Sequence, residues 1–494
     1  MSGVRQRAMG LAAGVLVLIM GAGGSAAAGA GAAARPVTNL QLLAGTDPDF
    51  PPRQGARALS ASPVFAVTGA SLELDVRRTG GVVSVRQGGV LLPVRPRSVL
   101  LGLPRYFQWK LLRTDGGVAA SAQVEACPMS GTLFGQNAWG FNMPVNIDPA
   151  NPDTPATNPY PLECGDPLTV RARWGFPTGW GVQMHIQVPD ATPPGAYMLE
   201  ATVNPDGAIR ESTRADNTVR MPVEVFDTGQ EAQAVAAPPA ATERTAVPRS
   251  VPPTAARAAG GRVDLPDLVP LPSENISAVP DDGVDLLRFS STVANLGRGT
   301  MRIDGFRSDM TATEMRAEQV LFRDGAEVSR RPAGTLVYDP EHFHWHFDYL
   351  ARYQLVDARG TVVATSGKIG FCMADVHQID AGNPAFALPD YEGFTGCGTA
   401  VSRSVRETLD PGWGDEYGQI RPGQALDISG IANGTYQLRI EADPEHKLQE
   451  ATRDNNISHR TVILGGTAGA RTVQVPPIDG VDTEAAWAAL GRTF

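Results

Sequence analysis

In the segment Tyr436-Gln437-Leu438-Arg439-Ile440, apolar or aromatic side chains alternate with polar ones, and residues 71–76 alternate in the same way. Alternation with a period of two is typical of a β-strand with one face in a hydrophobic core. Short runs of this kind recur between turns rich in Gly, Pro and Asn, in a sequence with 54 glycines and 40 prolines. The sequence therefore predicts an all-β protein of antiparallel β-sandwich architecture.

The chain also repeats itself. Residues 195–217 resemble residues 434–456, and residues 112–129 resemble residues 355–373. Between the copies, residues 229–262 are rich in Ala, Pro, Arg and Thr without apolar periodicity, which is typical of a linker. We therefore predict two tandem, related sandwich domains: a signal peptide and spacer (1–34), a first copy (35–228), the linker (229–262), a second copy (263–466) and a C-terminal tail (467–494).

The first residues of the chain have the pattern of an export signal. Arg5 and Arg7 precede an apolar run, residues 11–20, and small residues that suit a signal peptidase follow at 25–28. The run is short for a membrane span, and the alternative is that the signal is retained as an uncleaved anchor. We expect a secreted or cell-surface protein without an integral membrane span after removal of the signal.

Export permits disulfides, and the sequence has four cysteines, two in each copy. None has the C-x-x-C spacing of a metal site. We expect the pairs Cys127–Cys164 and Cys372–Cys397, each worth roughly 3 kcal/mol in the loop-entropy model. The net charge of −10 argues against a nucleic-acid partner, which would favour a basic surface.

Three of the seven histidines, His342, His344 and His346, lie at i, i+2 and i+4. Residues two apart share one face of an extended segment, so this spacing suits a strand or strand end. Three imidazoles from one short segment can bind a transition metal, and all-nitrogen ligation favours copper or zinc. The alternatives are a surface histidine cluster, or aromatic packing around Trp345. The matching residues of the first copy, 99–103, contain no histidine.

Lysine is rare in this chain: Lys110, Lys368 and Lys447 are the only three among 42 basic residues. A reactive primary amine requires lysine, because guanidinium stays protonated and is a poor nucleophile. Lys368 lies in a Gly-Lys-Ile-Gly-Phe-Cys stretch, where the first copy has Gln123. The alternative reading is an ordinary exposed strand lysine.

Ordered motifs between residues 263 and 464 carry a family resemblance. They begin with Leu-Pro-Asp-Leu-Val-Pro at 265–270 and continue through the histidine cluster and Tyr-Gln-Leu-Val-Asp at 353–357. Gly-Lys at 367–368, Phe-Cys at 371–372 and Gly-Trp-Gly-Asp-Glu-Tyr-Gly at 412–418 follow in order. This half of the chain resembles a lysyl oxidase catalytic domain, most nearly that of a bacterial member of the family.

The resemblance implies that His342, His344 and His346 bind one copper ion. It also implies that Lys368 and Tyr417 fuse into lysyl tyrosylquinone, the redox cofactor that the family makes from its own side chains. The expected activity is that of a lysyl oxidase-like protein-lysine 6-oxidase. Primary amines, with lysine-bearing proteins as the expected substrates, would be oxidised by molecular oxygen to aldehydes, with release of ammonia and hydrogen peroxide.

The first copy lacks the histidines, the lysine and the tyrosine together, since Phe176-Pro177-Thr178 stands near the place of Tyr417. We therefore interpret residues 35–228 as a non-catalytic copy for support or substrate presentation. For Tyr417 itself, the alternative is a half-buried aromatic side chain beside a turn.

A second metal site is implied by the same resemblance. Its calcium ligands would be oxygen donors of Asp267, the Leu268 carbonyl, Glu450, Asn455 and Asn456. Thr452 replaces an expected aspartate, and the first copy keeps Glu211, Asp216 and Asn217. Turns capped by Asn and Asp are the alternative explanation.

Other roles stay open at this level. His185, His377, His446 and His459 show no partner pattern and are expected to be structural or surface residues. Asp348 and Asp415 are near the motifs, but the sequence does not identify a general base. Competing functions are a non-enzymatic copper-binding or adhesive β-sandwich protein at the cell surface, and a zinc hydrolase. The natural amine and the oligomeric state are not predicted.

Overall fold

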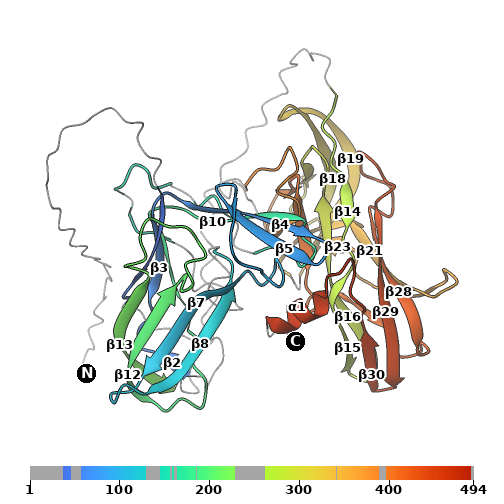
Figure 1. The fold of residues 1–494 in the computed structure, drawn as a ribbon. Coiled ribbons are helices and arrows are strands. Elements are labelled where there is room, and N and C mark those ends of the chain that lie inside the picture. Colours follow the sequence, from blue (N-terminus) through green and yellow to red (C-terminus); the bar gives the residue numbers. More distant parts are fainter. Residues whose placement is uncertain are drawn as a thin grey trace, which may run out of the picture. The chain divides into compact units, whose positions relative to one another are not determined.

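The structure is a computed structural model in which strands dominate both copies (Figure 1). It describes residues 37–45, 57–128, 145–148, 150–155, 158–160, 164–184, 186–227, 262–340, 342–388 and 397–490. The predicted signal peptide and linker therefore lie outside the described residues, as does His185. The helix in the described part of the chain is too short to cross a membrane.

Strands of the first copy form three sheets. The first has the order β1 (Thr38–Leu43), β3 (Val64–Gly69), β11 (Trp180–Gln183) and β9 (Val145–Asn146). The second has the order β10 (Arg171–Phe176), β4 (Leu72–Thr79), β5 (Val82–Gln87) and β6 (Val90–Leu91). The third has the order β2 (Arg57–Leu59), β13 (Thr218–Asp227), β12 (Gly195–Val203), β7 (Leu103–Leu112) and β8 (Val118–Ala126).

Strands of the second copy also form three sheets. The first has the order β14 (Leu268–Pro270), β16 (Val284–Asn295), β26 (Trp413–Tyr417) and β24 (His377–Gln378), with β15 (Glu274–Asp281) and β27 (Ala425–Asp427) paired to β16. The second is β23 (Gly370–Phe371), β20 (His344–Asp348), β19 (Ala326–Asp339), β18 (Glu314–Arg323), β17 (Met301–Phe306) and β25 (Ser404–Leu409). The third is β22 (Val362–Thr365), β21 (Ala351–Val356), β28 (Gly434–Ala442), β29 (Ile457–Thr467) and β30 (Ala470–Gln474).

Every pairing between these strands is antiparallel, so the all-β antiparallel prediction is confirmed. The alternating segment 436–440 lies in β28, where Leu438 and Ile440 are buried in the core. Residues 71–76 correspond in the same way to the start of β4, with Leu72, Leu74 and Val76 buried.

The two copies share a sheet order. In the first, β13, β12, β7 and β8 are neighbours, and in the second β29, β28, β21 and β22 follow the same order. Each copy has its own hydrophobic cluster, with Trp174 and Phe176 in one and Trp345 and Trp413 in the other. These parallels support the predicted repeat, and the predicted domain boundaries remain predictions. Residues 37–494 group as one compact unit.

Contacts between the copies involve β24. The Gln378 side chain bonds to the backbone N–H and C=O of Arg173 at 2.9 and 3.0 Å, and the Thr169 hydroxyl donates to the Gln378 carbonyl at 2.6 Å. Because β24 pairs with β26, these bonds support the strand that ends at Tyr417.

The predicted C-terminal tail, residues 467–494, contains strand β30 and the helix α1 (Thr483–Ala489). Asp482 caps the start of the helix: its side chain accepts the Ala485 N–H, one of the N–H groups that have no partner within the helix. Glu484 accepts the Ile276 N–H at 2.7 Å, and Trp487 is buried beside Leu100. The tail is thus part of the packed structure.

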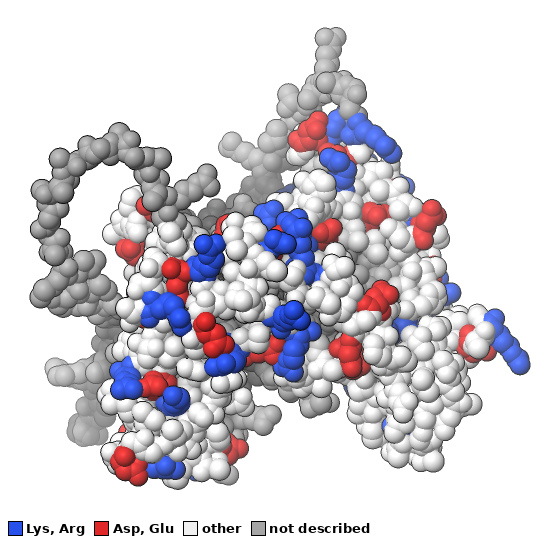
Figure 2. Space-filling model, in the orientation of Figure 1, with Lys and Arg blue, Asp and Glu red and all other residues white. Residues whose placement is uncertain are grey.

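Both expected disulfides, Cys127–Cys164 and Cys372–Cys397, are present. On the face shown in Figure 2, basic and acidic side chains are interspersed over the described residues.

Candidate metal and amine site

The three histidines come from a hairpin in the second copy. Strand β19 ends at Asp339, which pairs with His344 at the start of β20. His344 and His346 therefore share one face of β20, as their spacing predicts. His342 precedes the strand in the turn, where the exposed Phe343 has a left-handed backbone with φ of 60°. The spacing predicted a strand or a strand end, and the strand end is correct, because His344 and His346 lie on β20 and His342 lies just before it.

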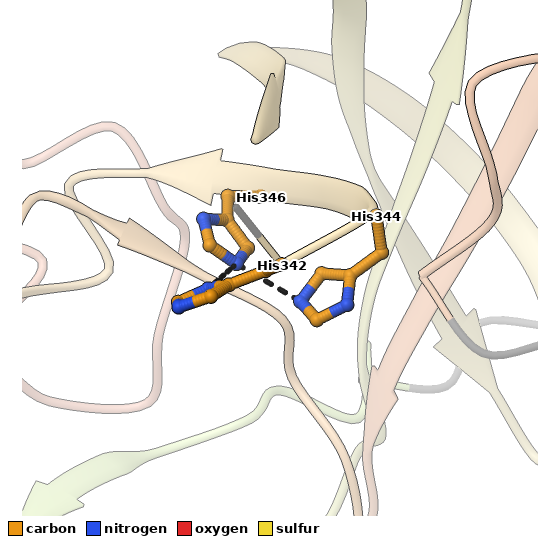
Figure 3. Close-up of side chains that lie close together, drawn as sticks. All are labelled: His342, His344 and His346. Atoms are coloured by element: carbon orange, nitrogen blue, oxygen red, sulfur yellow. Dashed lines mark hydrogen bonds between the residues drawn. The ribbon is translucent and has the colours of Figure 1, made fainter. Parts of the chain in front are cut away.

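The imidazoles converge on one point (Figure 3). His346 Nε2 lies 3.2 Å from His342 Nδ1 and 3.0 Å from His344 Nε2. One ligand nitrogen from each residue lies within 4.8 Å of the other two. Among the described residues this is the one group of histidine, cysteine or carboxylate side chains with such a geometry. Three lone pairs aimed at one point suit a copper or zinc ion.

Asp339 orients this cluster from the side. Its Oδ2 lies 3.3 Å from His346 Nδ1 and 3.5 Å from His342 Nδ1. A carboxylate that accepts the Nδ1–H of His346 leaves Nε2 as the free lone pair, which is the usual arrangement behind a metal-bound histidine. Burial lowers the pKa of His346 to about 3, with His344 and Lys368 adding to the shift, so this imidazole stays neutral.

Gly370 makes room for His346. A Cβ at this position would lie 2.8 Å from both Cβ and Nδ1 of His346, closer than such atoms approach in proteins. Gly370 is in β23, which pairs with β20 beside the histidines. The second glycine of the Gly-Lys-Ile-Gly-Phe-Cys stretch is therefore explained by its packing against His346.

Lys368 lies next to these histidines, between β22 and β23, and is only 7% exposed. Its Nζ is 4.6 Å from the centre of the Tyr417 ring and 5.1 Å from that of Phe371. Burial lowers the pKa of Lys368 to about 8, while Asp339 and Asp415 oppose the shift and Arg421 adds to it. A substantial fraction of this amine is therefore neutral near physiological pH, unlike an ordinary lysine.

Tyr417 is the last residue of β26, and contacts hold both its hydroxyl and its ring. Its hydroxyl donates to the Cys372 carbonyl at 3.1 Å and also accepts the Cys372 N–H. The ring of Phe371 packs edge-on against it, with centroids 5.0 Å apart. Burial raises the pKa of Tyr417, and Asp415 adds to the shift, so the phenol stays protonated. The ring is thus fixed with one face toward the Lys368 amine.

A pocket of about 350 Å³ opens onto this arrangement. Its lining includes His342, His346 and Lys368 together with the carboxylates Asp339 and Asp348. The pocket thus brings an amine, two metal-ligand candidates and negative charge together. The sequence motifs identified the histidines and the lysine and included Phe371. The contacts that Asp339 and Phe371 make could not be predicted, because they depend on strand pairing.

The five residues of the predicted calcium site also come together. Glu450 accepts the Leu268 N–H at 2.9 Å and an Asn456 N–H at 2.9 Å, while Asp267 accepts from Asn455 at 2.9 Å. The side-chain oxygens of both asparagines are buried without a hydrogen-bond partner among the described residues. Burial raises the pKa of Glu450 to about 7. Oxygen donors are present, and calcium at this place remains a proposal.

The remaining histidines behave differently. His377 is buried in β24, where its Nε2 lies 3.1 Å from Glu416, so it has a structural partner on the side of β26 away from Tyr417. His446 contacts Arg453 at 2.7 Å at the surface. His459 lies in β29. None of these three joins the cluster of His342, His344 and His346.

Comparison with known proteins decides the family. Residues 329–472 match the family model described as lysyl oxidase. Over these residues, the chain is therefore similar to the lysyl oxidase family. Human and bovine lysyl oxidase homolog 1 are each 30% identical over 132 residues, 26% of this chain. Zebrafish (Danio rerio) lysyl oxidase homolog 3B is 25% identical over 172 residues, 35% of this chain. The chain spans only 16–21% of the length of these curated relatives.

Proposed function

We propose that this chain is an exported copper-dependent amine oxidase whose cofactor, lysyl tyrosylquinone, is made from Lys368 and Tyr417. The observation that carries the proposal is the 4.6 Å separation between the Lys368 amine and the Tyr417 ring, beside three convergent imidazoles. Neither a surface histidine cluster nor an ordinary strand lysine accounts for this arrangement.

The metal-binding residues would be His342, His344 and His346, with Asp339 fixing the tautomer of His346. When bound, copper supplies the oxygen-dependent redox chemistry that oxidises the Tyr417 ring. Zinc would fit the same nitrogens, but zinc chemistry gives the neighbouring lysine and tyrosine no role.

Lys368 and Tyr417 have separate tasks before the cross-link forms. Burial keeps part of the Lys368 amine neutral, which a nucleophile requires. Cys372 and Phe371 hold the phenol ring in one orientation, so that the amine meets a ring face in a fixed geometry. The cross-link needs only a short movement of the flexible lysine stem.

The pocket suggests a cationic substrate. Asp339 and Asp348 in its lining would attract a protonated primary amine, and the peptidyl lysine side chain presents such a group on an apolar stem. We propose that primary amines, with peptidyl lysine as the main substrate, are converted by oxygen to aldehydes with release of ammonia and hydrogen peroxide. Export by the N-terminal signal would place this reaction outside the cytoplasm.

Peptide mass spectrometry of aerobically expressed, copper-loaded protein tests the proposal. We expect the peptides carrying Lys368 and Tyr417 to be covalently joined, with a gain of one oxygen and a loss of four hydrogens. Lys110, an exposed lysine that pairs with Glu200, is the internal control and should remain unmodified. Hydrogen peroxide release on addition of an alkyl amine is the functional counterpart.

Separate Lys368 and Tyr417 peptides, without peroxide release, would refute the oxidase. A metal-binding or adhesive sandwich would then explain the copper site, because such a protein tolerates Lys368→Arg. Calcium at Asp267, Glu450, Asn455 and Asn456 is proposed as a structural ion, because their donors are all oxygens.

A further inference from the structure

Strand β26 presents two neighbouring carboxylates in opposite directions. Asp415 and Tyr417 are two residues apart and therefore share one face of the strand. Glu416 points to the other face, where it meets His377 at 3.1 Å. Asp415 is the carboxylate on the side of the Tyr417 ring, and its charge acts on both Tyr417 and Lys368.

The surroundings of Asp415 are unusual for an aspartate. Its side chain is only 3% exposed, and the Ala374 backbone N–H donates to it. Its other oxygen, Oδ2, has no hydrogen-bond partner among the described residues. A buried carboxylate oxygen without a donor is costly, by roughly 1–3 kcal/mol or more for a charged group. A proton that reaches Oδ2 removes this cost and is therefore stabilised there.

Lys368 has the complementary requirement. Its amine must give up a proton before the nitrogen lone pair can bond to a ring carbon. Its exposure is only 7%, and it lines the pocket together with His342 and His346. No direct ion pair joins Lys368 and Asp415 in the described part of the chain, so the four-carbon lysine stem must rotate to bring them together.

We propose that Asp415 accepts the proton that Lys368 releases when its amine bonds to Tyr417. This inference rests on the proposed function and names a catalytic residue for its first step. One N–H proton of Lys368 moves to Asp415 Oδ2, and the nitrogen forms a bond to a carbon of the oxidised Tyr417 ring in place of hydrogen. Over the whole assembly, two oxygen molecules accept six electrons. One oxygen atom enters the ring, and one water and one hydrogen peroxide leave.

Other charged groups act on the two partners and must be held constant in any test. Around Lys368 these are Asp339, Arg421, His344 and His346. Around Asp415 they are Glu416, Asp375 and Glu407. Asp375 and Glu407 are buried acids on other elements, and the charge of Glu407 also acts on Tyr417.

The test follows cross-link formation itself and not amine turnover. Copper-free protein is mixed with copper in air, and the joined Lys368–Tyr417 peptide is measured over time by mass spectrometry. Asp415→Asn should slow its formation by about a hundredfold at pH 7, which is a typical contribution of a general base. Glu416→Gln, on the opposite face of the same strand, is the matched control and should stay close to the unmodified protein.

The pH dependence separates proton transfer from simple electrostatics. Raising the pH to about 10 supplies hydroxide as an alternative base, so Asp415→Asn should recover to within about tenfold of the unmodified protein. If Asp415 only stabilises the charged lysine, its removal lowers the pKa of Lys368 and cross-linking at pH 7 becomes faster. Faster or unchanged cross-linking in Asp415→Asn overturns the inference.

Asp415→Glu covers the case in which Asp415→Asn does not fold, as judged by thermal unfolding. It keeps a carboxylate and should cross-link within about tenfold of the unmodified protein. A rate as low as the background of protein without added copper would overturn the inference. If the unmodified protein never forms the cross-link, the proposed function fails instead, which is a distinct result.

Discussion

The two copies of the sandwich share a buried hydrogen-bond arrangement but differ in chemistry. In the first, Glu211 accepts the Leu40 N–H at 3.0 Å and an Asn217 N–H at 2.7 Å. In the second, Glu450 accepts from Leu268 and from Asn456, both at 2.9 Å. This Glu–Asn pair closes the ends of equivalent strands in both copies.

The reactive groups have no such counterpart. Gln123 stands in the first copy where the second has Lys368, and the residues opposite the histidine cluster are apolar. Features that recur therefore belong to the fold, and features of one copy belong to its chemistry. The comparison separates Glu450, which has a counterpart in Glu211, from Lys368, which has none.

Removing the lysine should have the largest effect. Lys368→Arg keeps the positive charge but removes the nucleophilic amine, so we expect no cross-link and a loss of amine oxidation of at least about a thousandfold. Lys110→Arg in the first copy is the matched control and should change neither. Peptide mass spectrometry and a peroxide assay measure both variants. Retained activity in Lys368→Arg would mean that the asymmetry between the copies is not catalytic.

Removing one imidazole should abolish tight metal binding. His346→Ala takes away the nitrogen on which the other two converge, and we expect copper affinity to fall by at least about a hundredfold. His459→Ala, a histidine outside the cluster, should bind copper as the unmodified protein does. Isothermal titration calorimetry gives both affinities, and equal values would place the metal elsewhere.

A single methyl group should weaken the same site more mildly. Gly370→Ala places a Cβ against the His346 ring, which must shift, and we expect copper affinity to fall by about 10- to 100-fold. Gly430→Ala has open space around its Cβ and serves as the control. If both variants bind copper equally well, the ring of His346 is not held by Gly370.

The Glu–Asn pairs should give the smallest effect, on stability alone. The pKa of Glu450 is raised to about 7, so the stability that it contributes is fully present below its unfolded value and is lost as the pH rises through 7. Glu450→Gln should remove this loss, of up to about 3 kcal/mol. Urea unfolding at pH 5 and pH 8 measures it.

Glu211→Gln sharpens the comparison, because burial also raises the pKa of Glu211. It should change stability in the same direction in the first copy. Added calcium offers a further distinction: stabilisation at pH 8 that Glu450→Gln abolishes would establish the ion in the second copy. A pH-independent difference between Glu450→Gln and the unmodified protein would contradict the raised pKa.

Much of the fold could be predicted from local patterns. The alternation in β28 and β4 identified strands, because a period of two directly reflects which face is buried. The seven residues of α1 could not be predicted, since so short a helix is stabilised by tertiary contacts such as those of Trp487 and Glu484. The repeat predicted that the two copies have related folds, but the order of strands in their sheets came from the structure.

The site divides in the same way. His344 and His346 followed from spacing, and Lys368 from its rarity and the family motif. The left-handed turn at Phe343 could not be predicted, because a bulky residue rarely adopts a positive φ and no sequence signal marks it. Asp339, Phe371 and the side of β26 that Asp415 faces depend on which strands pair, which only the fold determines.

The Cys372–Cys397 bridge has a consequence for how the protein must mature. Cys372 grips the Tyr417 hydroxyl through both its N–H and its carbonyl, so a free thiol there would loosen the ring that is to be modified. Oxidative folding should therefore precede copper loading. Protein made in a reducing cytosol or handled in dithiothreitol should bind the metal but lack the visible absorption of the proposed quinone.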